Sequence, residues 1–244
     1  MKLAFLGTRG YIDSSSSRHR RHTSTLVIYR NKKVMIDCGE DWLGQLKTVA
    51  PDAFVITHSH PDHAFGLIRG AVCPVYATQK AWEKIRQFPI ERSNRRILVI
   101  RRIEQIAGIR FEPFSVAHST RAPAVGYRIQ AGTAVVFYVP DVIRIHGRSE
   151  ALGGIHTYIG DGATISRPIL RREKQTNRLI GHTTILEQLA WCKREGVARM
   201  VITHCGSAIV KGDEDRIKET LRQRAAGYGI AIEIAYDGME VTLP

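Results

Sequence analysis

The segment "THSHPDHAFG", residues 57–66, places four side chains that can bind metal within six positions: His58, His60, Asp62 and His63. The first two histidines fall on the same side of an extended chain, and Pro61 ends the extension so that the aspartate and the third histidine turn back toward them. Divalent metals bind neutral imidazole and carboxylate together, and catalytic metal sites keep a position open for water. One histidine at a strand end is usually a surface or capping residue, but this cluster predicts two neighbouring metal sites.

The elements that must position these residues follow from the hydrophobic pattern. "AFVI", directly before the cluster, predicts a buried strand. Strands are predicted at Leu3–Leu6, Leu26–Tyr29, Val34–Ile36, Phe54–Ile56, Val125–Ile129, Ala134–Val139, Met200–Thr203 and Ile230–Ala235. Amphipathic helices are predicted at Thr78–Gln87, Thr184–Arg194 and Asp213–Ala225. Because several of the strands are too apolar to face water, this alternation predicts a layered α/β fold with covered sheets.

The chain is unusually basic, with 36 Lys and Arg against 23 Asp and Glu, a net charge of +13. Much of the excess lies in three stretches, residues 9–33, 84–102 and 144–178. Any one of them is explained by a solvated surface, but three together favour an anionic substrate, because clustered basic residues attract polyanions. With 244 residues and 43% hydrophobic content, the chain is expected to form one domain.

The N-terminal sequence "MKLAFLGTRG" has only a short apolar stretch before a glycine. No later run approaches the ~20 apolar residues that a membrane span requires. These observations predict a cytoplasmic protein without membrane association. The four cysteines are widely spaced and form no C-x-x-C pair, which favours reduced thiols over a disulfide framework or a cysteine zinc site.

The H-x-H-x-D-H segment resembles the signature of the metallo-β-lactamase superfamily, and "LAFLGTRG" resembles that family's opening L-G-T-x-G. The resemblance implies a four-layer αβ/βα sandwich spanning residues 1–244, with two metals at one edge. Three later segments, "FSVAHST", "VVFYVPDV" and "MVITHCG", resemble the settings of the family's remaining ligands. By this resemblance one metal is held by His58, His60 and His118, the other by Asp62, His63 and His204, and Asp141 lies between them.

Two cations about 3.5–4 Å apart can generate a hydroxide at neutral pH and stabilise both oxygens of an in-line displacement. Asp62, besides ligating, could orient this nucleophile. Zinc is the expected metal, and manganese or iron stays open. Cys205 is interpreted as structural, because Asp141 already fills the bridging position and adjacent strand residues point to opposite faces.

The segment "LIGHTTILEQLAWCKREGVARMVITHCG" resembles the G-H-[ST]-T, helix, T-H stretch of the ribonuclease Z and phosphoribosyl cyclic phosphodiesterase branches. In those branches a histidine ahead of the helix protonates the leaving oxygen, which assigns that role to His182. A histidine outside the ligand set suits general acid catalysis, since its pKa lies near neutrality. The alternative is a structural role, in which His182 satisfies free N–H groups at the start of the helix.

The chain departs from ribonuclease Z in its insertions. Those enzymes commonly carry a tRNA-clamping arm between the third histidine and the bridging aspartate, but here His118 and Asp141 are only 23 residues apart, which argues against tRNA 3′ processing. A basic insertion at residues 144–180 is interpreted as a lid over the metals or as a solvated loop. Its candidate phosphate contacts are His156, Arg167, Arg171, Arg172 and Lys174. His19 and His22 lie in a second basic loop that could touch substrate.

Together these features predict a dinuclear metal-dependent phosphodiesterase, which uses metal-bound hydroxide to hydrolyse a phosphate ester of a nucleotide, nucleic acid or cyclic sugar phosphate. An acyl hydrolase of thioesters, lactones or lactams stays open, although it would not explain His182 or the basic surface. A noncatalytic nucleic-acid-binding protein is a third reading, against which the complete ligand set speaks. A homodimer also stays open.

Overall fold

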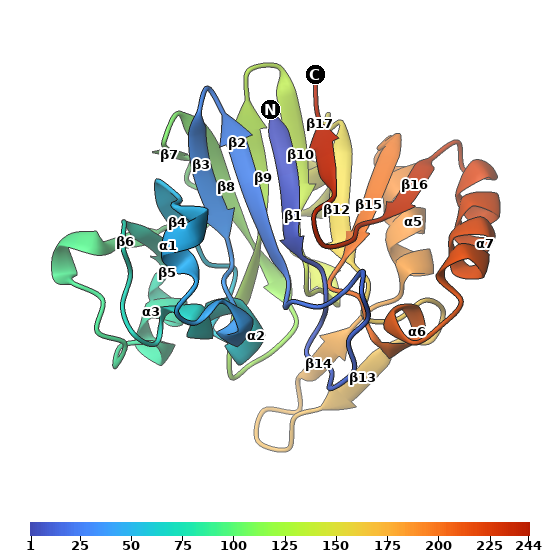
Figure 1. The fold of residues 1–244 in the computed structure, drawn as a ribbon. Coiled ribbons are helices and arrows are strands. Elements are labelled where there is room, and N and C mark those ends of the chain that lie inside the picture. Colours follow the sequence, from blue (N-terminus) through green and yellow to red (C-terminus); the bar gives the residue numbers. More distant parts are fainter.

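Two β-sheets dominate the computed structural model, which describes residues 1–244 (Figure 1). The first sheet has the strand order β17-β1-β2-β3-β4-β5-β6. Its strands are β1 (Lys2–Gly7), β2 (Ser24–Tyr29), β3 (Lys32–Ile36), β4 (Ala53–Val55), β5 (Val75–Thr78), β6 (Arg95–Leu98) and β17 (Glu240–Thr242).

The second sheet has the order β11-β8-β9-β10-β12-β15-β16, and β7 pairs with β8. Its strands are β7 (Glu104–Ile106), β8 (Ile109–Ala117), β9 (Ala124–Ala131), β10 (Ala134–Tyr138), β11 (Arg144–Ile145), β12 (Thr157–Asp161), β15 (Arg199–Thr203) and β16 (Ala231–Ile234). A separate two-stranded hairpin is formed by β13 (Ile169–Arg172) and β14 (Leu179–His182).

Helices cover the outer faces of the two sheets. The α-helices are α1 (Leu46–Val49), α2 (Pro61–Ala64), α3 (Gln79–Lys84), α4 (Arg148–Leu152), α5 (Ile185–Arg194), α6 (Ser207–Val210) and α7 (Glu214–Ala226). Short 3-10 turns are η1 (Glu40–Trp42), η2 (Phe65–Leu67) and η3 (Arg92–Asn94). No helix combines the length and the hydropathy that crossing a bilayer would need.

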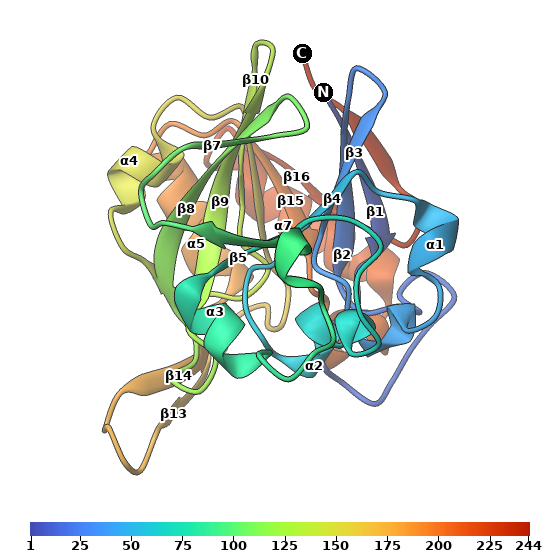
Figure 2. The same ribbon diagram turned by 90° about the vertical axis from the view of Figure 1, so that its left-hand side faces the viewer.

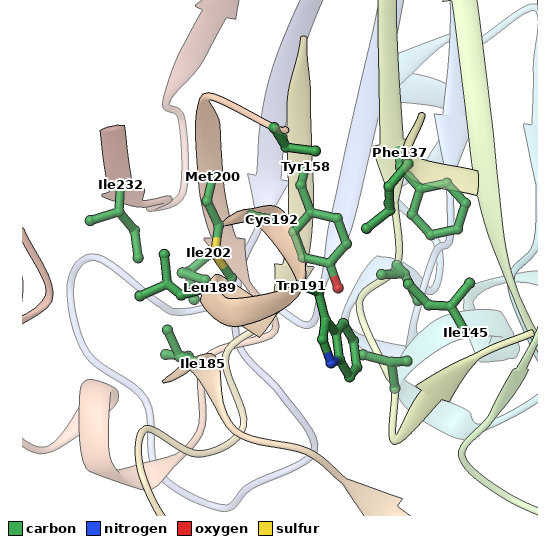
Figure 3. Packing of buried hydrophobic residues seen from close by; sticks show 14 of the residues in the cluster. Phe137, Ile145, Tyr158, Ile185, Leu189, Trp191, Cys192, Met200, Ile202 and Ile232 are labelled. Carbon is green, nitrogen blue, oxygen red and sulfur yellow. The ribbon is translucent and has the colours of Figure 1, made fainter. Parts of the chain in front are cut away.

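Three buried apolar clusters define the layers. One fills the space between the sheets, with Val27 and Val34 of the first sheet and Ile129 and Val201 of the second among its members. Another packs α1 and α3 on the first sheet. The third packs α4, α5, α6 and α7 on the second sheet. Figure 3 shows part of it, with Trp191 of α5 beside Tyr158 of β12. This is the predicted four-layer αβ/βα sandwich.

Every predicted strand is present within one or two residues of its expected position. The β2–β3 hairpin turns at Arg30 and Asn31, both with positive φ (48° and 63°), as the predicted turn at Asn31 requires. The predicted helix over residues 78–87 ends early, at Lys84. The basic segment 144–180 is divided: residues 157–161 form the fully buried strand β12, and the β13–β14 hairpin projects from the body of the molecule (Figure 2).

The site lies where parallel strands end. β3 runs parallel to β4, and β10, β12 and β15 are parallel to one another. Their carboxyl ends therefore meet at one edge of the sandwich, which is where open α/β sheets place ligands. In Figure 1 the helix α2, the β13–β14 hairpin and the loop after β1 all lie at this lower end.

Candidate metal centre

The H-x-H-x-D-H segment turns as its proline predicts. β4 ends at Val55, His60 is extended with φ −67° and ψ 155°, and Pro61 opens the short helix α2. Proline fits the first turn of a helix because it has no N–H to satisfy there. Asp62 and His63 lie within this helix, and both side chains are buried. The reversal brings them back toward the two preceding histidines.

The three distant residues arrive from the second sheet. His118 follows β8, Asp141 follows β10, and His204 follows β15; all three are buried. Together with the residues of the first motif they form groups of three that could each hold a cation, in which the ligand atoms lie within 4.8 Å of one another. These groups include His58, His60 and His118; Asp62, His63 and His204; and His58, His63 and Asp141. The first two groups are the two ligand sets expected from the family resemblance. Two further groups overlap them, His118 with Asp141 and His182, and Asp161 with His182 and His204.

Several polar atoms of the cluster converge without forming hydrogen bonds. His63 Nε2 lies 3.0 Å from Asp62 Oδ2 and 2.9 Å from Asp141 Oδ2, yet His63 Nε2, Asp141 Oδ2 and His204 Nδ1 are buried with no hydrogen-bond partner. Unsatisfied buried polar groups are costly, and native proteins keep them mainly where an ion or a reaction uses them. Imidazole nitrogens and carboxylate oxygens aimed at common points fit divalent cations.

The buried charges of the cluster shift one another's pKa values. Burial, together with the neighbouring His118, lowers the pKa of His60 to about 4, so its imidazole is neutral at pH 7. Burial raises the pKa of Asp141, but the surrounding histidines outweigh it and hold the carboxylate pKa well below its usual range. Burial lowers the pKa of His204, yet Asp141, Asp161 and Asp62 raise it to about 10. The carboxylates of Asp62, Asp141 and Asp161 therefore stabilise positive charge at His204. A bound divalent cation would supply such a charge in place of the proton.

A strained backbone aims His204 at the cluster. The residue has a φ of 54°, in the left-handed region that residues other than glycine rarely adopt, and such strain gathers at functional sites. Backbone hydrogen bonds from Cys205 N to Thr8 O (2.6 Å) and from Gly10 N to Cys205 O (3.0 Å) hold this conformation. Cys205 is fully buried within the apolar cluster under α5, α6 and α7, in agreement with its structural interpretation.

Sequence reasoning missed Asp37, a fully buried carboxylate just after β3. Its Oδ2 accepts from His63 Nδ1 (2.8 Å) and from the Thr57 hydroxyl (2.7 Å), and its Oδ1 accepts from Thr57 N (2.7 Å). His118 Nδ1 bonds in the same way to Gly181 O (2.9 Å). Such contacts fix the tautomer of a ligating histidine, because Nδ1 is occupied and Nε2 faces the cluster.

A second missed residue, Asp161, ends β12 and is fully buried. Its Oδ2 lies 2.8 Å from His182 Nδ1, and its Oδ1 lies 3.7 Å from His204 Nδ1. The backbone amides of Val142 and Ala163 donate to the same carboxylate. Burial lowers the pKa of His182, but the Asp161 carboxylate more than offsets this, so the net shift is upward.

The helix after His182 is capped by another residue. Thr184 is the N-cap of α5, where its side chain accepts from Glu187 N (3.0 Å). The first two amides of the helix donate to Thr164 O and Ile165 O. The free N–H groups at this end thus have partners without His182. Its side chain is 17% exposed and its ring stacks on that of His204, with centroids 5.6 Å apart.

A cleft of about 1190 Å³ opens over the cluster. The cluster side chains in its wall are His60, Asp62, His118, Asp141, His182 and His204. The β13–β14 hairpin contributes Arg171, Arg172 and Lys174. Arg171 and Lys174 have no acidic partner within ion-pair distance. The basic hairpin thus faces the same space as the metal-binding side chains.

Four other sequence-based candidates lie elsewhere. His156 stands at the opposite end of β12 from Asp161, where its ring bonds to Val135 N, and Arg167 is exposed but does not line the cleft. We therefore drop both as phosphate contacts. His19 and His22 are buried rather than presented to substrate, because His19 bonds to Thr8 and His22 lies against Asp41. The basic composition of their loop concealed these internal contacts.

Comparison with known proteins gives the family. The sequence model of a protein family, the beta-lactamase superfamily domain, matches residues 32–205 of this chain. A ribonuclease Z from Methanopyrus kandleri is 25% identical and covers 98% of this chain and 96% of its own. A ribonuclease Z from Clostridium acetobutylicum is 35% identical over a shorter stretch, 28% of this chain and 22% of its own.

Solved structures share the fold. The metallo-beta-lactamase fold protein YhfI from Bacillus subtilis superposes with a TM-score of 0.76 at 17% identity over 98% of both chains. A diphosphatase from the PhnP family gives 0.73 at 21% identity, over 100% of this chain and 98% of its own. The human short-form tRNase Z gives 0.66 at 16% identity over all of both chains.

The family and the His/Asp cluster support a metal-dependent hydrolase. The chain belongs to the beta-lactamase superfamily domain family, on the side of it that resembles ribonuclease Z. This confirms the superfamily and the fold predicted from the H-x-H-x-D-H segment.

Proposed function

We propose that the protein is a dinuclear phosphodiesterase acting on a phosphate ester of a nucleotide, a nucleic acid or a cyclic sugar phosphate. His58, His60 and His118 would hold one divalent cation, Asp62, His63 and His204 the other, and Asp141 both. Bound there, the cations would activate water and neutralise charge on the phosphate oxygens. Zinc suits these nitrogen and oxygen ligands, as do manganese and iron.

The chain's own residues supply the rest of the chemistry. His182 donates a proton to the departing oxygen, and Asp161 positions its ring through Nδ1 and raises its pKa, which favours the protonated form. No protein group bonds His182 Nε2, and the side chain lines the cleft, so this nitrogen is free to reach the leaving group. Arg171, Arg172 and Lys174 attract the anionic substrate.

The single observation that carries the proposal is the Asp161–His182 pair beside the cluster. A thioester releases a thiolate that needs no proton, whereas an alkyl or ribose phosphodiester releases an oxygen that does, and a basic cleft favours the anionic phosphodiester. A panel assay with metal-loaded protein tests the choice, comparing kcat/KM for single-stranded RNA and DNA, a cyclic phosphate, an aryl phosphodiester, a thioester and a lactam. We expect the phosphodiesters to be preferred. Faster turnover of the thioester or lactam would support the acyl alternative.

The role of Asp161 can be tested with Asp161→Asn, which keeps the shape but removes the charge. We expect kcat to fall about 10–100-fold, the usual effect of losing a residue that orients a functional histidine. Since the general acid must be protonated, activity declines as pH rises through its pKa. The carboxylate raises that pKa, so its loss should move the alkaline limb of the kcat profile to lower pH. An unmoved limb with full metal content would contradict the assignment.

The hairpin's role can be tested by salt dependence of binding. Affinity for a single-stranded oligonucleotide should fall steeply with salt, since each phosphate contact releases counterions. Arg171→Ala should lower the slope of log K against log[salt] by about one. Arg110, exposed at the far end of β8 from His118, is the matched control and should leave the slope unchanged. Affinity that does not depend on salt would exclude the polyanion role.

A further inference from the structure

Tyr11 is the most exposed of the large hydrophobic side chains, with 62% of its surface accessible. A single exposed aromatic is ordinary on a protein surface. The position of Tyr11 is unusual, because its side chain lines the same cleft as the metal cluster. No hydrogen bond to the protein engages its hydroxyl.

The backbone under Tyr11 is held firmly on both sides. Gly10 N donates to Cys205 O (3.0 Å), Ile12 N donates to Gly10 O (2.8 Å), and the buried Arg9 guanidinium donates to Ile12 O. Arg9 is itself fixed by an ion pair with Asp41 at 2.8 Å. A ring on such a support can bind a ligand without first ordering its backbone, which reduces the entropic cost of binding.

Tyr11 also stands next to the reacting centre. The preceding glycine packs on the His204 ring so closely that a Cβ at Gly10 would lie 3.1 Å from His204 Cε1. The Tyr11 ring contacts the ring of His22, with centroids 5.9 Å apart and planes tilted by 40°. His22 is buried and supports one side of the tyrosine, while the exposed remainder faces the cleft.

We propose that Tyr11 is a stacking platform for a nucleobase adjacent to the cleaved phosphodiester. The inference rests on the function proposed above and narrows its substrate to phosphodiesters that carry a base, since a cyclic sugar phosphate has no flat face to stack. Ile12 and Ala208 add apolar surface to the wall of the same cleft. Stacking on an aromatic side chain tolerates every base, so little base preference is expected.

The test compares a ribodinucleotide with a matched dinucleotide that lacks both bases. Stacking contributes about 1–3 kcal/mol per base, which corresponds to roughly 5- to 150-fold in affinity. Tyr11→Ala should therefore raise KM for the ribodinucleotide by about this factor with kcat little changed, and leave the abasic substrate unaffected. Tyr11→Phe should behave like wild type, because the ring is retained. Tyr228→Ala, an exposed tyrosine outside the cleft, should change neither substrate.

Equal increases in KM for the two substrates would overturn the stacking role. A Tyr11→Phe variant whose KM for the ribodinucleotide rises as much as that of Tyr11→Ala would also overturn it, because the effect would then belong to the hydroxyl. Calorimetric titration with both dinucleotides separates this inference from the proposed function. If the wild type hydrolyses neither compound, the phosphodiesterase proposal fails. Weaker binding of the ribodinucleotide alone by Tyr11→Ala would still support stacking, and equal binding would refute it.

Discussion

Replacing His60 or Asp141 by alanine should abolish turnover of every substrate. The wild-type protein should carry about two transition metals per chain, because six of the side chains form two groups of three, and Asp141 forms a further group with a histidine of each, His58 and His63. His60→Ala removes one of three ligands from a single group. Asp141→Ala removes the carboxylate between the groups and leaves His63 Nε2 without its neighbour at 2.9 Å. Elemental analysis and turnover should be measured on the same samples.

His146→Ala is the matched control, because His146 is exposed and belongs to none of the metal-binding groups. This variant should keep both metals and full activity. Removal of metal by a chelator should stop hydrolysis, and adding zinc or manganese back should restore it. Protein that is stripped of metal and still hydrolyses phosphodiesters at the wild-type rate would contradict the role given to the cluster.

His182→Ala should keep both metals and the fold yet lose roughly 10²–10⁴-fold in kcat, the usual contribution of a positioned proton donor. The loss should depend on the leaving group. An aryl phosphodiester releases an acidic phenol that departs without help, so its hydrolysis should suffer little. A ribose or alkyl leaving group has a much higher pKa and should suffer the full loss.

This contrast separates proton donation from positioning, which would slow both substrates alike. Equal losses would remove the general-acid assignment. Loss of metal in the variant would instead indicate that His182 is a metal ligand. This outcome has to be checked because His182 forms a possible metal-binding group with His118 and Asp141. Metal content should therefore be measured beside the rates.

The fold could be predicted because its strands are read from local patterns. Strands such as β4 and β15 are largely apolar runs; β15 ends directly before His204, and β4 ends three residues before His58. β12 was harder to predict: "TYIGD" is short, contains a glycine, and lies in a basic segment that suggested a surface loop. Its burial arises from its two parallel neighbours, β10 and β15, which no local pattern records.

The same distinction holds within the site. The members of the metal cluster could be named from the motif and its later matches, but Asp37 and Asp161 are lone carboxylates in sequence. Each acquires its role from a histidine that is distant along the chain, His63 or His182. In both cases the available signal was an acidic residue at or just after the end of a buried strand, a place where a charge needs a partner.

The central claim is that water attacks phosphorus at this centre and that the alcohol leaves with the proton of His182. Hydrolysis of a dinucleotide by the metal-loaded protein in ¹⁸O-labelled water tests it most directly, with mass spectrometry of both products. We predict one ¹⁸O atom in the phosphate-bearing product and none in the released alcohol. Label in the alcohol would show cleavage of the carbon–oxygen bond and would contradict the mechanism.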